Sequence, residues 1–324
     1  MQFSIIDTRW HAIDKAAWDH VAQAAGGSYL LAHGRLAVWR VMQRLAGNRL
    51  RFLQIMAGNL VAGQCVMVSR GGGHQVHERL MLLPEFAPFW SQAMQAVLGH
   101  AGRGIFRYGR SMSVAPSRRE ELAQISGVTI RQVTPYSLQV IEFADFADWG
   151  DYWRRLNSNV KRNVRGAEAR HTLGLASDSG KTVLRLLPGF FKTALGKDYN
   201  RHRIMELVGD MRGLATIAIG LREAAVMTRA FADSDNVAWQ YHVGFGGTVY
   251  YVAGTSRRMQ PSPAWWLTIK TFEKIWQNPD CQRIVLGNFF PDIYNESEGW
   301  GILQWRKFCQ ARDFPSEIVE FSYE

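Results

Sequence analysis

The order of predicted elements, which occurs twice along this 324-residue chain, is the strongest constraint on its fold. In each half, apolar residues recur at helical spacing and then alternate as in strands, and a further helix and strand follow. The first half shows helices at 14–24 and 35–46, a hairpin at 50–69, a helix at 85–100 and a strand at 104–108. Because strands joined by tight turns pair antiparallel, the pattern predicts an α+β fold built from a duplicated unit.

The division between the halves is predicted near the segment FADFADWGD. A helix at 117–124 and a strand at 137–142 precede it, and no long Pro-, Gly- or Ser-rich linker marks it. We therefore expect an N-terminal domain at 1–145 and a C-terminal domain at 146–324. The elements expected in the second domain are helices at 148–171, 189–209 and 263–277 and strands at 215–221, 225–232, 237–245, 248–253, 283–286 and 317–323.

Composition narrows the class of partner. The formal net charge is +10, and arginine supplies 30 of the 38 basic residues. Planar guanidinium groups suit phosphate and carboxylate partners, so a negatively charged partner is indicated. The alternative explanation is a GC-rich genome, which favours arginine codons throughout a protein.

The sequence disfavours disulfide-rich, metal-binding, secreted and membrane-spanning proteins. The three cysteines, at 65, 281 and 309, form no CxxC pair, so we expect neither a disulfide framework nor a metal site. The pair His74 and His77 beside a glycine triplet is interpreted as a polar loop. No signal peptide is evident, and no run approaches 18 apolar residues. These observations predict a cytoplasmic protein without a membrane span.

The predicted helix that opens the second half carries a dense positive charge. Between Tyr152 and Arg170, apolar residues recur three or four positions apart on one face, and the basic residues lie off that face. Only Asp151 and Glu168 offset them. The basic face is either a site for phosphate groups or RNA backbone, or a solvated surface. Its candidate phosphate-binding residues are Arg154, Lys161, Arg162 and Arg165.

The hairpin within 239–258 is a second candidate site. Strand alternation places Gln240 and His242 on one face and Tyr241 on the other, and Tyr251 follows on the second strand. Such a strand is able to orient a polar substrate. The alternative interpretation is a sheet with one solvent-exposed face.

A third candidate follows the hairpin. Ser262 and Pro263 form a predicted helix start, whose free backbone N–H groups suit an anion or oxyanion. Trp265 is expected to line the adjacent pocket. The strand at 283–286 leads into a loop at 287–301 that is dense in polar and aromatic residues.

In this order the features resemble the tandem acetyltransferase-fold (GNAT-like) group that includes the Fem peptidyltransferases and the cellulose-cluster acetyltransferase-like proteins. An Arg- and Lys-rich helix opens the second domain of that group, as at 153–170 here. A strand pair around a glycine turn follows, matched at 239–253, and then Ser262-Pro263-Ala264 matches a Ser-Pro-small helix start. The resemblance implies two tandem GNAT-like domains, each a mostly antiparallel sheet flanked by helices.

Two positions depart from the group's pattern. A Tyr-Lys pair usually precedes an aromatic-Gly pair, whereas this chain has Tyr294-Asn295 before Trp300-Gly301. The group's Asp after the last strand is replaced by Gly287-Asn288. Because Asn295 replaces the lysine, the phosphate contact that the lysine makes in relatives is not expected here.

The resemblance also implies the reaction, which is transfer of an acyl or aminoacyl group to an amine. No Ser-His-Asp set or reactive-cysteine context is visible, and direct transfer requires neither. Single-domain acetyltransferases hold CoA on a Gly-rich turn, but prolines at 261 and 263 remove N–H donors here. This favours aminoacyl-tRNA as the donor co-substrate over acyl-CoA. A non-catalytic RNA- or polyanion-binding module on the same fold is the remaining alternative.

The candidate site follows from these motifs. No bound cofactor is expected, and the expected acceptor is a small-molecule or peptide amine. The predicted catalytic residues are Tyr294, Tyr241 and His242, and the predicted substrate-binding residues are Gln240, Tyr251, Ser262, Trp265, Asn288 and Trp300.

Overall fold

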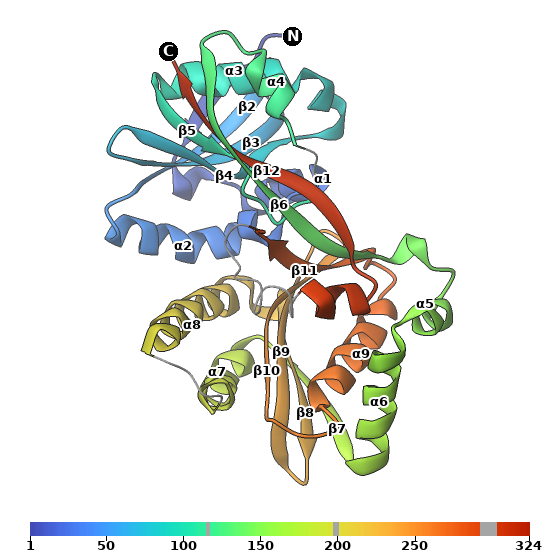
Figure 1. The fold of residues 1–324 in the computed structure, drawn as a ribbon. Coiled ribbons are helices and arrows are strands. Elements are labelled where there is room, and N and C mark those ends of the chain that lie inside the picture. The colour runs from blue at the N-terminus through green and yellow to red at the C-terminus, as the bar shows by residue number, and fades with distance from the viewer. Residues whose placement is uncertain (115–116, 197–200, 292–302) are drawn as a thin grey trace. The chain divides into compact units, whose positions relative to one another are not determined.

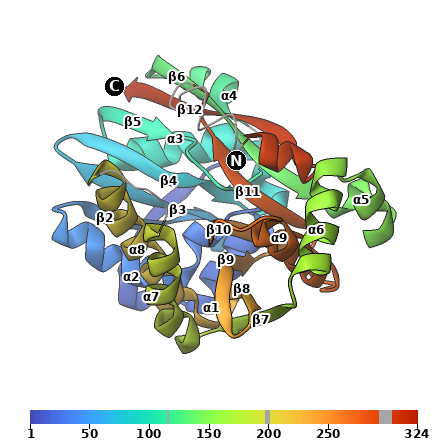
Figure 2. The ribbon, with the colours of Figure 1, turned by 60° about the horizontal axis from the view of Figure 1, so that its bottom comes forward.

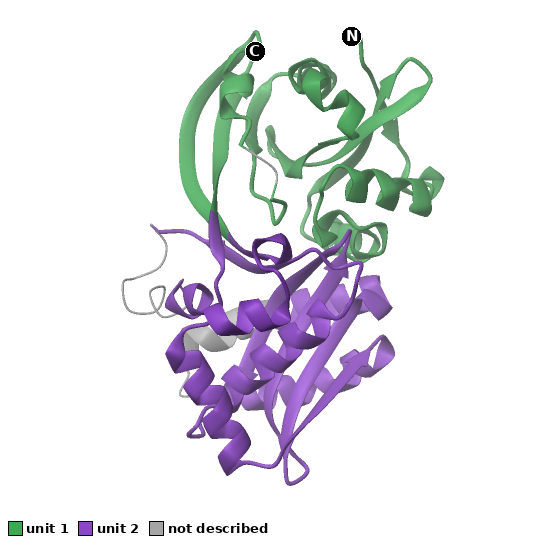
Figure 3. Ribbon diagram, turned by 90° about the vertical axis from the view of Figure 1, so that its right-hand side faces the viewer, with its two compact units in different colours: residues 1–138, 314–324 green, residues 139–313 purple. Residues whose placement is uncertain are grey.

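The chain divides into two compact units (Figure 3). The computed structural model describes residues 1–114, 117–196, 201–291 and 303–324, and only the backbone of 201–210. Unit 1 comprises Met1–Leu138 and Phe314–Glu324, and unit 2 comprises Gln139–Asp313. The structural division therefore falls at Leu138/Gln139 rather than at 145/146, and the C-terminal strand belongs to unit 1 because it pairs there.

Unit 1 is a mixed sheet flanked by helices (Figure 1). Its strand order is β1-β2-β3-β4-β5-β12-β6, with β4 and β5 parallel and the long strand β12 antiparallel to β5. Helix α3 packs its buried side chains, among them Trp90 and Val97, against the sheet core around Phe106. The elements are β1 (Ser4–Thr8), α1 (Lys15–Ala24), α2 (His33–Leu45), β2 (Arg49–Ala57), β3 (Leu60–Arg70), β4 (Gly73–Leu82), α3 (Trp90–Ala101), β5 (Gly104–Tyr108), α4 (Arg119–Ala123), β6 (Val128–Glu142) and β12 (Arg312–Tyr323).

Unit 2 repeats this plan. Its strands follow the order β11-β10-β9-β8-β7, and β10 and β11 form the parallel pair. A helical segment over 303–308 precedes β12. The elements are α5 (Trp149–Arg155), α6 (Ser158–Arg170), β7 (Leu173–Ser179), α7 (Lys181–Leu195), α8 (Arg201–Leu221), β8 (Ala225–Ala232), β9 (Asp235–Phe245), β10 (Thr248–Ser256), α9 (Pro263–Trp276) and β11 (Arg283–Phe289).

Helices cover both faces of the unit 2 sheet (Figure 2). Helices α7 and α8 lie on one face, where Trp239 Nε1 donates to Thr193 Oγ1 of α7 at 3.0 Å and Tyr241 Oη donates to the Leu214 carbonyl of α8 at 3.3 Å. Helices α6 and α9 lie on the other face, where Gln240 Nε2 donates to Thr268 Oγ1 of α9 at 2.5 Å. The predicted alternation of Gln240 and Tyr241 is therefore confirmed.

The α+β class and most predicted elements are confirmed, and one strand prediction was wrong. Residues 215–221 form the end of α8, not a strand. Their β-branched residues imitate a strand, but the buried side chains of Leu214, Ile217 and Ala218 recur at helical spacing. The predicted helix at 148–171 is two helices, because the chain turns at Leu156 and Asn157 caps α6 by accepting from the Asn159 N–H at 2.8 Å.

Three strands were not predicted, namely β1, β4 and β7. The most instructive is β4, because the glycines before it were interpreted only as a break. Gly71 and Gly72 have φ of +55° and +81°, and they form the tight turn that joins β3 to β4.

The exposure of Ile217 and Ile219 distinguishes a helix at 215–221 from a strand. Ile217 and Ile219 would share one face of a strand, but in α8 Ile217 is 6% exposed and Ile219 is 50% exposed. Ile217→Asn should destabilise the protein by about 3 kcal/mol, because it buries an amide and removes apolar contacts. Ile219→Asn should change the unfolding free energy by less than about 0.5 kcal/mol. Urea unfolding measures both values, and equal losses would contradict the assignment.

Candidate functional site

The sheet of unit 2 opens beside β10. The described pairing of β10 with β11 covers only Thr248–Tyr250, whereas its pairing with β9 continues to Ser256. The register of β10 against β9 shifts between Tyr251 and Ala253, which marks a β-bulge. Bulges turn a strand locally and interrupt its ladder. Beyond Tyr250, the edge of β10 that faces β11 therefore has no strand partner among the described residues.

Polar side chains line the α9-facing side of this opening. His242 lies opposite Tyr251 in the β9–β10 register, and their ring centroids are 6.4 Å apart in an edge-on arrangement. His242 Nε2 is 3.1 Å from Thr228 Oγ1 of β8. Gln240 is buried, and its Oε1 has no hydrogen-bond partner within the described part of the chain. The structure thus brings together the predicted residues Gln240, His242 and Tyr251.

Burial controls the charge state of His242. The side chain is 4% exposed, and burial lowers its pKa to about 3. Desolvation penalises the imidazolium form, so the ring is neutral near pH 7. A neutral ring accepts or donates a hydrogen bond, but it holds no extra proton at that pH.

Tyr251 is placed by a close approach to Gly254. A Cβ atom at position 254 would lie 2.0 Å from Tyr251 Oη, so only glycine leaves room for the hydroxyl there. The Tyr251 ring also packs against Trp305, with centroids 5.3 Å apart. Burial raises the pKa of Tyr251, and the nearby Arg306 partly opposes that rise. The hydroxyl is therefore protonated near pH 7 and able to donate a hydrogen bond.

Arg306 is the residue that the sequence did not reveal. Its Nη1 donates to Gln139 Oε1 at 2.6 Å and to the Asn288 carbonyl at 3.0 Å. Gly287 has a φ of +121°, and a Cβ there would lie 2.8 Å from Arg306 Nη2. Asn288, a predicted site residue, has a buried Oδ1 without a hydrogen-bond partner within the described residues. The only available signal was the Gly287-Asn288 pair, which the sequence placed after a strand at 283–286 and which lies within β11.

The remaining predicted residues of this region do not cluster in one place. Ser262 is the N-cap of α9 with Pro263 at the first position, and the Ser262 side chain makes no capping bond. Trp265 packs partly buried against the unit 2 core. Tyr241 lies on the opposite face of the sheet from His242, with its hydroxyl bonded to α8. The predicted residues Tyr294 and Trp300 lie outside the described residues.

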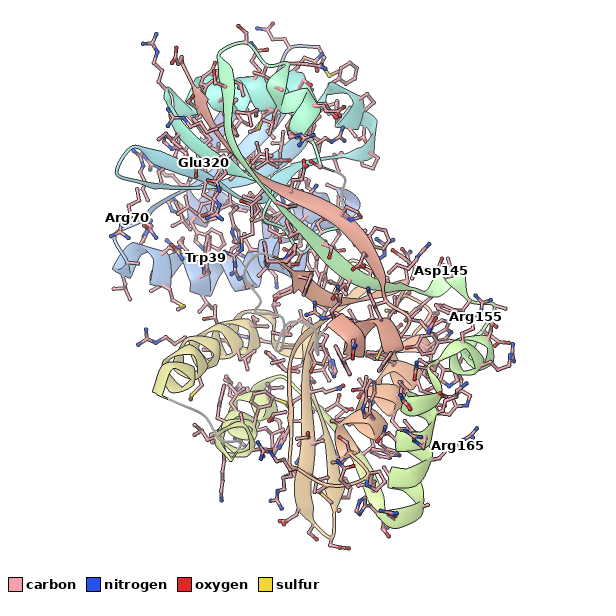
Figure 4. All side chains as sticks on the ribbon, viewed as in Figure 1. Trp39, Arg70, Asp145, Arg155, Arg165 and Glu320 are labelled. Carbon is pink, nitrogen blue, oxygen red and sulfur yellow. The ribbon has the colours of Figure 1, made fainter. Side chains whose placement is uncertain are left out.

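The predicted basic face lies on α5 and α6. The apolar face of these helices is buried, and Gly166 of α6 packs so closely on Pro261 that a Cβ would lie 2.9 Å from its Cγ. Asp151 pairs with Arg154 at 3.3 Å and with Arg155 at 2.7 Å. Figure 4 shows Arg165 on the side of α6 that points away from α9.

The other predicted cations of this face make local contacts. Lys161 Nζ donates to the Arg154 carbonyl at 2.9 Å, and Arg162 donates to Asn159 Oδ1 at 2.8 Å. No ion pair to Lys161, Arg162 or Arg165 is present among the described residues. These cations are therefore available to an anionic partner.

A second basic feature lies where β10 ends. A cavity of about 380 Å³ is lined by Lys192, Ser256, Arg257 and Arg258 together with the turn that leads into β9. Arg257 pairs with Asp235 at 2.8 Å, so this cation is already partly neutralised.

Unit 1 has the same opening, but its own chain lies against it. The described β4–β5 pairing covers Gly73–Gln75, and the β3–β4 register shifts farther along. There Glu78, at a φ of +62° and fully buried, accepts from the Met112 N–H at 2.7 Å. Burial raises the pKa of Glu78. Tyr136 Oη of β6 donates to the Gly109 carbonyl at 2.7 Å, so Glu78 and Tyr136 together hold the segment after β5 against β4 and β6.

Among the described residues, no group of three or more His, Cys, Asp or Glu side chains is arranged to hold a metal ion. Within the same residues, no helix has the length and apolar character that a membrane crossing requires.

Comparison with known proteins shows the fold. No family model matches this sequence, and no curated protein matches it. The solved structure of FemX is 12% identical, with a TM-score of 0.71 over 100% of this chain and 97% of FemX. L-PGS from Bacillus licheniformis is 9% identical, with a TM-score of 0.56 over 96% of this chain and 92% of that one. A tandem GNAT protein from the clavulanic acid biosynthesis pathway is 9% identical, with a TM-score of 0.52 over 99% and 98%.

The chain therefore has a tandem GNAT-like fold of the Fem type. This confirms the resemblance and the fold class that the sequence predicted.

The depressed pKa of His242 predicts a pH dependence of stability. Unfolded histidine binds a proton below about pH 6.5, whereas folded His242 binds one only near pH 3, so stability falls as the pH falls through this window. The loss should reach about 1.4 kcal/mol per pH unit for this group. His242→Asn should remove that part of the slope in urea unfolding between pH 7 and 5. The exposed His11→Asn is the control, and an unchanged slope in His242→Asn would contradict the burial argument.

Proposed function

We propose that this chain is an N-acyl or aminoacyl transferase, which forms an amide by direct transfer of an activated acyl group to an amine. The observation that carries the proposal is the opening beside β10, where an unpaired strand edge, a protonated tyrosine hydroxyl and a buried arginine lie close together. The tandem GNAT-like fold supports the same class of reaction.

Direct transfer requires few reacting groups from the protein. The amine nitrogen attacks the acyl carbon, the bond from that carbon to the leaving atom breaks, and the proton lost by the amine ends on the leaving atom. The protein must hold the two reactants in line and stabilise the oxyanion that forms. Backbone N–H groups along the free edge of β10, beyond Tyr250, supply donors for that oxyanion.

Tyr251 is the proposed hydrogen-bond donor to the leaving group. Its pKa is raised by burial, so the hydroxyl carries its proton at neutral pH. An ester leaving group needs such a donor more than a thioester does, because an alkoxide is far more basic than a thiolate. We assign His242 to positioning Tyr251, since a ring with a pKa of about 3 is too weak a base to deprotonate an amine.

The other predicted site residues keep or change their roles in this proposal as follows. We propose that Gln240, Asn288 and Trp265 contact the substrates and that the α9 start at Ser262 meets the donor. Tyr241 is left out of the reacting groups because its hydroxyl bonds to α8. The roles predicted for Tyr294 as a catalytic residue and for Trp300 as a substrate-binding residue stay predictions.

We favour aminoacyl-tRNA as the donor. The loop before α9 begins with Arg257 and Arg258 and so offers positive charge, whereas Pro261 and Pro263 lack the backbone N–H donors that a compact pyrophosphate would use there. Together with the cations of α6, this supports a polyanionic donor. The proposed acceptor is a small-molecule or peptide amine, and the proposed compartment is the cytoplasm.

A donor assay tests the proposal. The wild-type protein should transfer label from a mixture of labelled aminoacyl-tRNAs to amine acceptors, and prior RNase treatment should abolish transfer. Tyr251→Phe should lower the rate by roughly 10²-fold, the range that a lost proton donor produces. Tyr323→Phe, which removes a hydroxyl at the end of β12, is the matched control and should retain the wild-type rate.

The alternatives give other outcomes in the same assay. RNase-resistant transfer from acyl-CoA, with CoA release, would replace the donor and keep the reaction. Salt-dependent RNA binding without transfer from any donor would instead indicate a non-catalytic module and overturn the proposal.

The contact between Gly254 and Tyr251 gives an independent prediction. Gly254→Ala should push the Tyr251 hydroxyl out of position and lower transfer to the level of Tyr251→Phe, with no further loss in the double variant. Gly244→Ala is the matched control, because a Cβ there meets nothing within 4 Å. Initial rates and thermal unfolding measure the effect. A Gly254→Ala protein with wild-type rate would show that the hydroxyl position does not matter.

A further inference from the structure

A dense group of arginines surrounds a cavity in unit 1. A cavity of about 550 Å³ lies between the end of β1, helix α2 and the start of β2, of which Figure 1 labels α2 and β2. Its lining holds a single carboxylate, Asp7, and five arginines, which are Arg9, Arg40, Arg44, Arg49 and Arg51.

Most of this charge has no counter-ion. Arg51 Nε pairs with Asp7 Oδ2 at 2.8 Å, and no other ion pair in the described chain involves these arginines. Arg9, Arg44 and Arg49 are exposed at the rim. Guanidinium groups that line one cavity repel one another, because salt screens charges only incompletely over such short separations. An anion that enters the cavity would offset this repulsion.

Arg40 shows where that anion meets the protein. Its guanidinium carbon lies 5.3 Å from the centroid of the Trp10 ring, and its Nε is buried without a hydrogen-bond partner within the described residues. Burial lowers the pKa of Arg40, and the neighbouring Arg44 lowers it further. A buried donor without a partner is costly, and a phosphate oxygen would satisfy it.

The lining favours a phosphate chain over a nucleoside. The Trp10 ring is already packed against His33 at 4.3 Å and Phe52 at 4.8 Å between centroids, in addition to Arg40, so it is not free to stack on a base. Asp7 Oδ2, an oxygen of the only carboxylate in the lining, is already engaged by Arg51 Nε. What the cavity presents is guanidinium groups spread over three elements, which suits consecutive phosphates of a nucleic-acid backbone.

We propose that this arginine cavity of unit 1 binds the phosphate backbone of RNA, and that it holds the tRNA part of the donor, a step that rests on the proposed function. A lipid bilayer is the less favoured partner, because its surface meets flat or convex faces whereas these cations line a recess.

Binding of bulk deacylated tRNA to the full chain tests the proposal. Fluorescence anisotropy is measured between 50 and 300 mM salt, where phosphate contacts dominate the slope of log Kd against log salt. The double variant Arg44→Ala/Arg49→Ala, at two exposed positions, should weaken binding about tenfold and reduce the slope of log Kd against log salt by about two. The matched control is Arg103→Ala/Arg131→Ala, which removes two exposed arginines of the same unit.

The outcomes separate this inference from the proposed function. Transfer activity together with tRNA binding that the Arg44/Arg49 variant leaves unchanged would overturn the inference and keep the function. Cavity-dependent tRNA binding without transfer from any donor would uphold the inference and overturn the function. Binding of phosphatidylglycerol vesicles that the variant abolishes, with tRNA binding unaltered, would also overturn the inference.

Discussion

The early end of the pairing between β10 and β11 is the constraint on which unit 2 depends. A parallel ladder that continued beyond Tyr250 would consume the backbone N–H and C=O groups of β10 in the sheet. The bulge after Tyr251 instead turns the strand and leaves those groups available. Tyr251 begins this free edge, and its hydroxyl lies so close to Gly254 that a Cβ atom at that position would collide with it.

The two units share one backbone plan but place different side chains at the opening beside the parallel strand pair. Both have a short parallel pairing and a register shift on the strand before the crossover helix. In unit 1 the strand carries the buried carboxylate of Glu78, which binds the N–H of Met112 and fastens the following segment against β4. In unit 2 the corresponding strand carries Tyr251 and Gly254 instead. The fold therefore provides the opening in both units, and the side chains that line it differ between them.

Local patterns predicted the elements and the strand faces, because strand alternation and helix starts are determined by neighbours in sequence. This is why the facing of His242 and Tyr241 and the start of α9 at Pro263 could be predicted. Arg306 could not be found this way, since its contacts with Gln139 and Asn288 join residues far apart in sequence. The strand predicted at 215–221 was wrong because β-branched composition outweighed the helical spacing of the buried positions.

The long strand β12 has a consequence for how the protein is made. In unit 1 it lies between β5 and β6, yet its residues are synthesised after the whole of unit 2. The emerging N-terminal half therefore exposes two strand edges that nothing covers until translation reaches residue 314 and beyond. Unit 1 therefore gains its central strand β12 only after the residues of unit 2 have been synthesised, although most of unit 1 precedes unit 2 in the sequence.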